Sequence, residues 1–199
     1  IGGRRALELA GAGVDDMALV DVYSCFPSAV QVAANELGLS LDDPDRPLTV
    51  TGGLTFAGGP WNNYVTHSIA TMAERLAAEP GNRGLITANG GYLTKHSFGV
   101  YGTEPPAHEF RWEDVQPAVD AEPTVAAEVE WSGVGTVETW TTPYDREGEP
   151  EKAFLAVRTP DDARTLAVLT DRSEARASVT DDIAGAKVTV HADGTASLG

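Results

Sequence analysis

The first hundred residues alternate between two hydrophobic periods. Short apolar runs of the length typical of buried strands occur at 17–23, 47–53, 83–89 and 96–101. Apolar residues spaced three and four apart predict amphipathic helices at 28–38 and 62–81, and a further helix is predicted at 3–10. Strands that alternate with helices predict an α/β layer in which helices pack on a sheet.

The last eighty residues show the pattern of strands alone. Strand-like runs occur at 124–131, 133–142, 152–159 and 164–170, and a hairpin is predicted over 186–198 with its turn at Asp193-Gly194. Five or six short strands around a small core predict a small all-β barrel of the OB type. We therefore expect an α/β domain at 1–103, a linker at 104–123 with four prolines, and the barrel at 124–199.

The beginning of the chain is unusual for an α/β domain. It starts inside the first predicted helix, and no strand-like run precedes that helix. A half-domain without its opening strand leaves a sheet edge and an apolar face uncovered. We expect this chain to be a piece of a longer polypeptide, or to pair with another chain.

Charge and cysteine content exclude several classes of function. The formal net charge is −16, with −4 in residues 1–103 and −12 in residues 104–199, which argues against nucleic-acid binding by either part. No apolar run approaches the roughly 20 residues of a membrane span, and we expect a cytoplasmic protein. The single cysteine, Cys25, excludes an internal disulfide and a cysteine zinc site, and no other spacing indicates a metal.

Three loops follow predicted strands of the α/β domain and carry its reactive side chains. They are "YSCFPS" (23–28), "GGLTFAGGPWNNY" (52–64) and "ANGGYLTKH" (88–96). Open α/β sheets gather functional groups at the carboxyl ends of their strands, so we expect these loops to lie together. The glycines carry no phosphate-binding spacing such as GxxxxGK, and they serve either the approach of a ligand or simple turns.

Each reactive residue also has a purely structural interpretation. Cys25 is either a nucleophile or acyl-stabilising group, or a small buried apolar residue. His67, on the second amphipathic helix, fits a hydrogen-bonded packing residue better than a base. His96 follows a glycine-rich turn beside Lys95 and fits both interpretations.

The order of these loops resembles the C-terminal half of a thiolase, the family that condenses or cleaves acyl-CoA thioesters. "VDVYSCFPSA" lies where thiolases carry an Asn-Glu-Ala-Phe loop, and it is closer to the His-Asp-Cys-Phe variant of the sterol-carrier-protein-x thiolases. "GGLTFAGGPWNN" resembles the loop with Gly-His-Pro, and "GLITANGGYL" resembles the strand that ends in Cys-x-Gly. The resemblance covers residues 1 to about 103 and implies that the half with the acyl-accepting cysteine is missing.

The resemblance also implies which site residues are replaced. The Gly-His-Pro histidine aligns with Gly59, the second cysteine aligns with Asn89, and the oxyanion-hole asparagine position holds Tyr23. Glycine has no side chain and asparagine does not titrate, so neither replacement supplies the base of Claisen chemistry. The remaining candidates for catalysis are Tyr23, Cys25, Tyr92 and His96.

The whole pattern looks like the divergent acetyl-CoA acetyltransferases of lipid metabolism, including the type 1 thiolase-like proteins with an additional C-terminal domain. This implies an acyltransferase or carbon–carbon lyase with acyl-CoA as its ligand, no tightly bound cofactor, and a homodimer, with this fragment inactive by itself. Arg75, Arg83 or Lys95 would then form a cationic patch for CoA, and the barrel would dock on or cover the body or a partner chain. The alternatives are a protein that binds CoA esters without catalysis, and a scaffold that binds partners.

Overall fold

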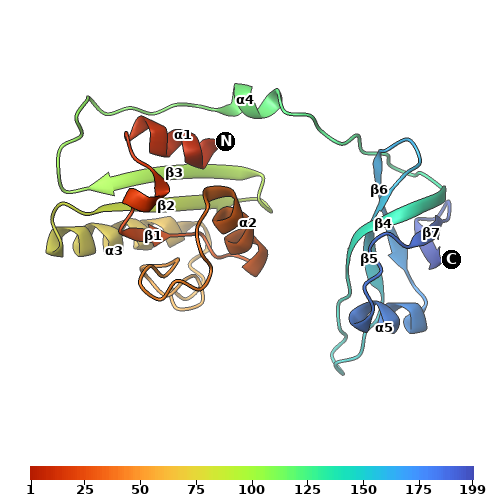
Figure 1. Cartoon of the computed structure of the whole chain (residues 1–199). Coiled ribbons are helices and arrows are strands. Elements are labelled where there is room, and N and C mark those ends of the chain that lie inside the picture. Colours follow the sequence, from red (N-terminus) through yellow and green to blue (C-terminus); the bar gives the residue numbers. More distant parts are fainter. The chain divides into compact units, whose positions relative to one another are not determined.

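Three strands form the sheet of the first unit (Figure 1). The computed structural model describes residues 1–199 and divides them into two units, Ile1–Glu122 and Pro123–Gly199. The strands β1 (Leu19–Asp21), β2 (Arg83–Gly90) and β3 (Lys95–Gly102) lie in the order β1-β2-β3. β1 is parallel to β2, and β3 is antiparallel to β2, with Asn89 opposite His96.

Helices cover both faces of this sheet, as the alternation of apolar residues along β1 requires. Val20 packs in one core cluster with Leu7 of α1 (Gly2–Leu9) and Ala34 of α2 (Pro27–Leu37). Leu19 points to the other face and packs with Met72 of α3 (Tyr64–Ala78). Two 3₁₀ turns, Val14–Asp16 and Trp61–Asn63, and the short helix α4 (Gln116–Asp120) complete the unit. No helix has the length and apolar character needed to cross a bilayer.

The predicted strand at 47–53 is wrong. The segment lies beside the end of β1, where Val22 N donates to Leu48 O at 2.8 Å, but it forms no ladder. The side chain of Asp21 takes the hydrogen bond of Val50 N at 3.0 Å, and the Thr49 hydroxyl takes that of Thr51 N at 3.2 Å. Side-chain acceptors therefore satisfy the backbone donors that a neighbouring strand would have used.

The second unit is a closed barrel of five strands in the order β4-β5-β6-β8-β7. The strands are β4 (Gly133–Thr141), β5 (Ala153–Arg158), β6 (Arg164–Leu169), β7 (Lys187–Val190) and β8 (Thr195–Leu198). All neighbours are antiparallel except β6 and β8. Every second residue of β5 and β6 points inward, so that Leu155, Val157 and Leu169 are almost completely buried in one core.

Two features of this unit differ from the prediction. The expected strand at 124–131 is reduced to a single bridge between Ala127 and Arg164, because Glu130 takes a left-handed conformation with φ of 61° and ends the extended chain. A helix that was not predicted, α5 (Arg172–Thr180), connects β6 to β7. Asp171 followed three residues later by Glu174 is a start signal for a helix that the sequence does carry.

We expect the stability of the barrel unit to fall in acid through the cap of α5. The Asp171 carboxylate accepts hydrogen bonds from Ser173 and from the backbone N–H of Glu174, and these bonds hold its pKa below the usual value. A lowered pKa stabilises the fold fully above the unfolded-state value of about 4, and this contribution is lost as pH falls through the folded-state value. Thermal melts at pH 7 and pH 3 check this: Asp171→Asn, which still accepts the cap bonds, should lose less stability in acid than the wild type. An equal loss in both proteins would contradict the prediction.

Candidate functional site

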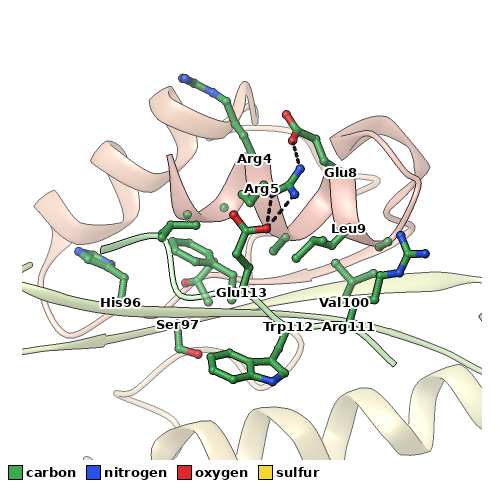
Figure 2. Close-up of a pocket in the computed structure, with 18 of the residues that line it drawn as sticks. Arg4, Arg5, Glu8, Leu9, His96, Ser97, Val100, Arg111, Trp112 and Glu113 are labelled. Carbon is green, nitrogen blue, oxygen red and sulfur yellow. Dashed lines mark hydrogen bonds and ion pairs between the residues drawn. The ribbon is translucent and has the colours of Figure 1, made fainter. Parts of the chain in front are cut away.

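A groove of about 1380 Å³ runs along β3 in the first unit. Its walls include residues of α1, of β3 and of the segment 104–119, and Figure 2 shows some of them. β3 pairs with β2 on one side only and is the last strand of the sheet, so its other edge is free. The groove therefore exposes a strand edge whose backbone N–H and C=O groups have no ladder partner.

One arginine fastens the segment 104–119 to α1. Figure 2 shows Arg5 between Glu8 and Glu113, with dashed lines to both carboxylates. Arg5 Nε and Nη2 reach Glu113 Oε2 at 2.8 and 2.7 Å, and Nη1 reaches Glu8 Oε2 at 2.9 Å. The guanidinium is thus committed to these two partners and is not free for a ligand.

Polar side chains from the loop after β1, from β2 and from the start of β3 line part of the groove. Tyr23, Thr87, Asn89 and His96 all contribute to it. Tyr23 is buried, and its backbone N–H donates to Thr87 Oγ1 at 2.9 Å, which fixes the residue to the neighbouring strand. Burial, followed by the nearby Cys25 and Tyr64, raises the pKa of Tyr23. Its hydroxyl therefore stays protonated at neutral pH and acts as a donor rather than as a base.

Cys25 and Asn89 are in direct contact, although they are 64 residues apart in the sequence. Asn89 Nδ2 donates to Cys25 Sγ at 3.2 Å. The other amide atom, Asn89 Oδ1, is buried and has no hydrogen-bond partner. The loop after β1 and the end of β2 thus bring together two of the positions that the resemblance singled out.

His96 and Tyr92 are more exposed. His96 Nε2 lies 2.9 Å from Leu93 O, and since a carbonyl oxygen only accepts, Nε2 carries the proton and Nδ1 is left to accept. Tyr92 is 88% exposed and stacks on Phe26, with ring centroids 6.3 Å apart. Tyr92 does not line the groove, whereas Tyr23 and His96 do.

The glycine-rich loop after residue 51 lies against the same corner. Gly52, Gly53, Gly58 and Gly59 all have positive φ values, between 57° and 89°, which explains why glycine is needed there. Leu54 N donates to Ser24 Oγ at 3.0 Å and joins this loop to the one that carries Tyr23 and Cys25. A Cβ atom at Gly59 would meet nothing within 4 Å, so the position opens to free space.

One buried acid was missed as a site residue because it interrupts an apolar run. Asp21, in "MALVDVY", is completely buried and accepts hydrogen bonds from the loop at 49–50 and from α3. The sequence signal was present: a charged residue inside a buried strand needs several partners.

Two of the three residues named as candidates for a cationic patch, Arg83 and Lys95, do not lie together. Arg83 pairs with Gly102 and Lys95 with Gly90, so the two cations stand at opposite ends of the β2–β3 hairpin. His67 is exposed on α3 and outside the groove. No group of three or more His, Cys, Asp or Glu side chains lies close enough to hold a metal ion.

Comparison with known proteins gives one match to most of the second unit and one match to nearly the whole chain. The model of the domain family described as "Thiolase-like protein type 1 additional C-terminal domain" matches residues 114–195. The crystal structure of a monomeric SCP2-thiolase like protein type 1 from Mycobacterium smegmatis superposes with a TM-score of 0.88 at 38% sequence identity. The match covers 98% of this chain and 44% of that chain, so the present chain spans less than half of the length of this relative. No curated protein matches the sequence.

The family model and the structural match agree. The structural match extends over nearly all of the chain, and the domain model covers most of the second unit. The chain therefore belongs to the thiolase-like proteins that carry the type 1 additional C-terminal domain.

Proposed function

We propose that this chain is the C-terminal part of a thiolase-like acyltransferase that acts on acyl-CoA thioesters. The observation that carries the proposal is the position of Tyr23. By the sequence resemblance it occupies the oxyanion-hole position of thiolases. It also lines the groove, and burial raises its pKa further above neutral pH, so that its hydroxyl is protonated. A protonated hydroxyl can donate to a thioester oxygen as negative charge develops on it.

The other candidate residues suggest that the hydrogen-bond donor and the proton acceptor are different residues. By the sequence resemblance, Gly59 and Asn89 replace the activating histidine and the second cysteine of thiolases, so another group must carry the proton. His96 offers Nδ1 as an acceptor in the same groove as Tyr23. Cys25 is held by the Asn89 amide, and Tyr92 lies outside the groove. We therefore assign the donor to Tyr23 and the proton acceptor to His96, and we keep Cys25 and Tyr92 as secondary candidates.

The test is CoA-dependent cleavage of acetoacetyl-CoA by the complete protein that contains this chain, followed by loss of the thioester absorbance. Tyr23→Phe removes only the hydroxyl, and we expect it to lower kcat by about 10²–10³-fold, the loss typical of one oxyanion donor. Tyr144→Phe in the barrel unit is the matched control and should leave the rate unchanged. Equal rates for wild type and Tyr23→Phe would remove Tyr23 from the mechanism.

The absence of a titrating side chain at Gly59 and Asn89 favours a second function, the binding of CoA esters without catalysis. A site in which neither replacement titrates can still bind CoA esters without condensing them. If the wild type shows no turnover but binds acetyl-CoA saturably in calorimetry, the protein is a CoA-ester-binding member of the family. CoA or an acyl-CoA is then its ligand, and no tightly bound cofactor is needed.

The free edge of β3 supports a proposal for the partner. An extended strand laid into the groove would complete the ladder that β3 leaves open and cover its apolar wall. We propose that this strand comes from the other half of a thiolase-like polypeptide, because the M. smegmatis relative is more than twice as long and is described as monomeric. A partner chain, or a second copy in a homodimer, is the alternative.

We further propose that the barrel is of the OB type and serves as a docking domain. The order β4-β5-β6-β8-β7, the single parallel pair β6–β8 and a helix between β6 and β7 support this assignment. The net charge of −12 over residues 104–199 favours a protein partner over a nucleic acid. We also keep the proposal of a cytoplasmic location.

A further inference from the structure

We propose that Asp21 is the positioning residue of the candidate site, and that it holds both Tyr23 and the glycine-rich loop in place. This inference rests on the proposed function. Asp21 itself lines no groove and is completely shielded from solvent, so it does not touch the substrate. Its influence must pass through the groups that it binds.

Four donors surround the Asp21 carboxylate. Thr49 Oγ1 and Val50 N both donate to Oδ2 at 3.0 Å. Ser68 Oγ donates to Oδ1 at 2.6 Å, and the Tyr64 hydroxyl reaches Oδ1 at 3.0 Å and Oδ2 at 3.3 Å. A carboxylate offers about four acceptor positions, so these donors fill them. The side chain thus joins β1 to the 49–50 segment and to the first turns of α3.

The acceptor character of Asp21 sets the direction of a longer chain of hydrogen bonds. Because the Tyr64 hydroxyl donates to Asp21, the Thr51 hydroxyl at 2.8 Å must donate to Tyr64. Thr51 Oγ1 in turn accepts from Gly53 N at 3.1 Å. The chain therefore runs from the beginning of the glycine-rich loop through two hydroxyls to the buried acid, and every proton in it points toward Asp21.

The same chain supports Tyr23. The Tyr23 ring packs edge-on against the Tyr64 ring, with centroids 5.3 Å apart and planes at 87°. Tyr64 is itself completely buried, so its ring cannot shift without its hydroxyl leaving Asp21. A loss of the acceptor would release both the wall behind Tyr23 and the loop that reaches Gly59. A displacement of about 1 Å in a site can lower a rate by about 10²-fold.

The variants Asp21→Asn and Tyr64→Phe test this arrangement by hydrogen–deuterium exchange and by kinetics on the complete protein. Asp21→Asn replaces two acceptor positions by donors, so we expect exchange in residues 49–54 to rise at least about tenfold. Tyr64→Phe breaks the chain one step later. It should free the Thr51 hydroxyl and raise exchange at Gly53, while the N–H groups of Val50 and Thr51 stay protected by Asp21 and Thr49. Leu76→Ala is the control, because it opens the α3 core without touching the network.

The outcomes distinguish a positioning role of Asp21 from a general contribution to the stability of the unit. Selective exchange at 49–54 relative to β2, together with a fall in kcat of about 10- to 100-fold and a smaller change in KM, is the expected result. Exchange that rises equally in β2, as expected for Leu76→Ala, would overturn the inference. If the wild type shows no turnover, the proposed function fails while the exchange result still decides whether Asp21 holds the loop. If Asp21→Asn does not fold, the graded pattern of Tyr64→Phe decides the same question.

Discussion

Leu169→Ala is expected to lower the free energy of unfolding of the barrel unit by about 2–5 kcal/mol. Leu169 has no exposed surface and lies in the core cluster with Leu155, Val157 and Val188. Truncation removes apolar contacts and leaves a cavity that a closed barrel cannot collapse to fill.

Leu166→Ala provides a matched control on the same strand. Leu166 lies on the outer face of β6 and is 76% exposed, so its truncation should change stability by no more than about 0.5 kcal/mol. Urea denaturation of the chain followed by tryptophan fluorescence measures both. Trp131 and Trp140 pack against the barrel core, whereas Trp61 and Trp112 are 90% and 76% exposed, so the signal reports mainly on this unit. Similar midpoints for the two variants would contradict the inward and outward assignment of β6.

Barrel strands were predictable where a recognisable turn motif lies between them in the sequence. Asp193-Gly194 and the Pro160-Asp161-Asp162-Ala163 segment mark the ends of four strands. The order of the strands was not predictable, since the parallel pair β6–β8 joins residues on either side of a helix that the apolar pattern hides. α5 buries only Ala175 and Ser178, and two small residues give no amphipathic signal.

The α/β unit shows a different limit. Its three predicted helices and three of its four predicted strands are confirmed. The segment at 47–53 has the same apolar character, but its backbone donors are taken by the side chains of Asp21 and Thr49. Local propensity cannot show such a competition, because the acceptor Asp21 lies almost thirty residues earlier in the chain.

The sequence predicted which loops form the candidate site, but it did not predict the groove. That the loops after β1 and β2 lie together follows from strand order, and the contact of Cys25 with Asn89 agrees with it. The groove could not be predicted, because its walls combine α1 with a proline-rich segment about one hundred residues away. The position of Tyr92 outside the groove and against Phe26 could likewise not be predicted, because Tyr92 and Leu93 take left-handed backbone conformations.

Gly84→Ala is expected to destabilise the first unit by about 1–3 kcal/mol, although alanine is an ordinary strand residue. A Cβ atom at this position would clash with Met72 Sδ and would lie 2.8 Å from Met72 Cε. Met72 is flexible in principle, but its side chain is completely buried between α3 and the sheet and has no space into which to move. Gly84 therefore sets the distance at which α3 packs on β2, and a methyl group there must push the helix away from the strand.

Gly102→Ala, on β3 opposite Arg83 and next to the partner of Gly84, is the control for this effect. Its added Cβ would meet only Asn82 O at 3.6 Å and Arg83 Cγ at 3.7 Å, which are ordinary contacts. Amide exchange resolved by segment follows the two variants: protection of β2 and α3 should fall in Gly84→Ala and stay at the wild-type level in Gly102→Ala. Because α3 carries Tyr64 and Ser68, a displaced helix also pulls two donors away from Asp21. Faster exchange at 49–54 in Gly84→Ala would thus show that the packing of α3 on β2 and the order of residues 49–54 are coupled. Unchanged exchange at 49–54 would show that they are independent.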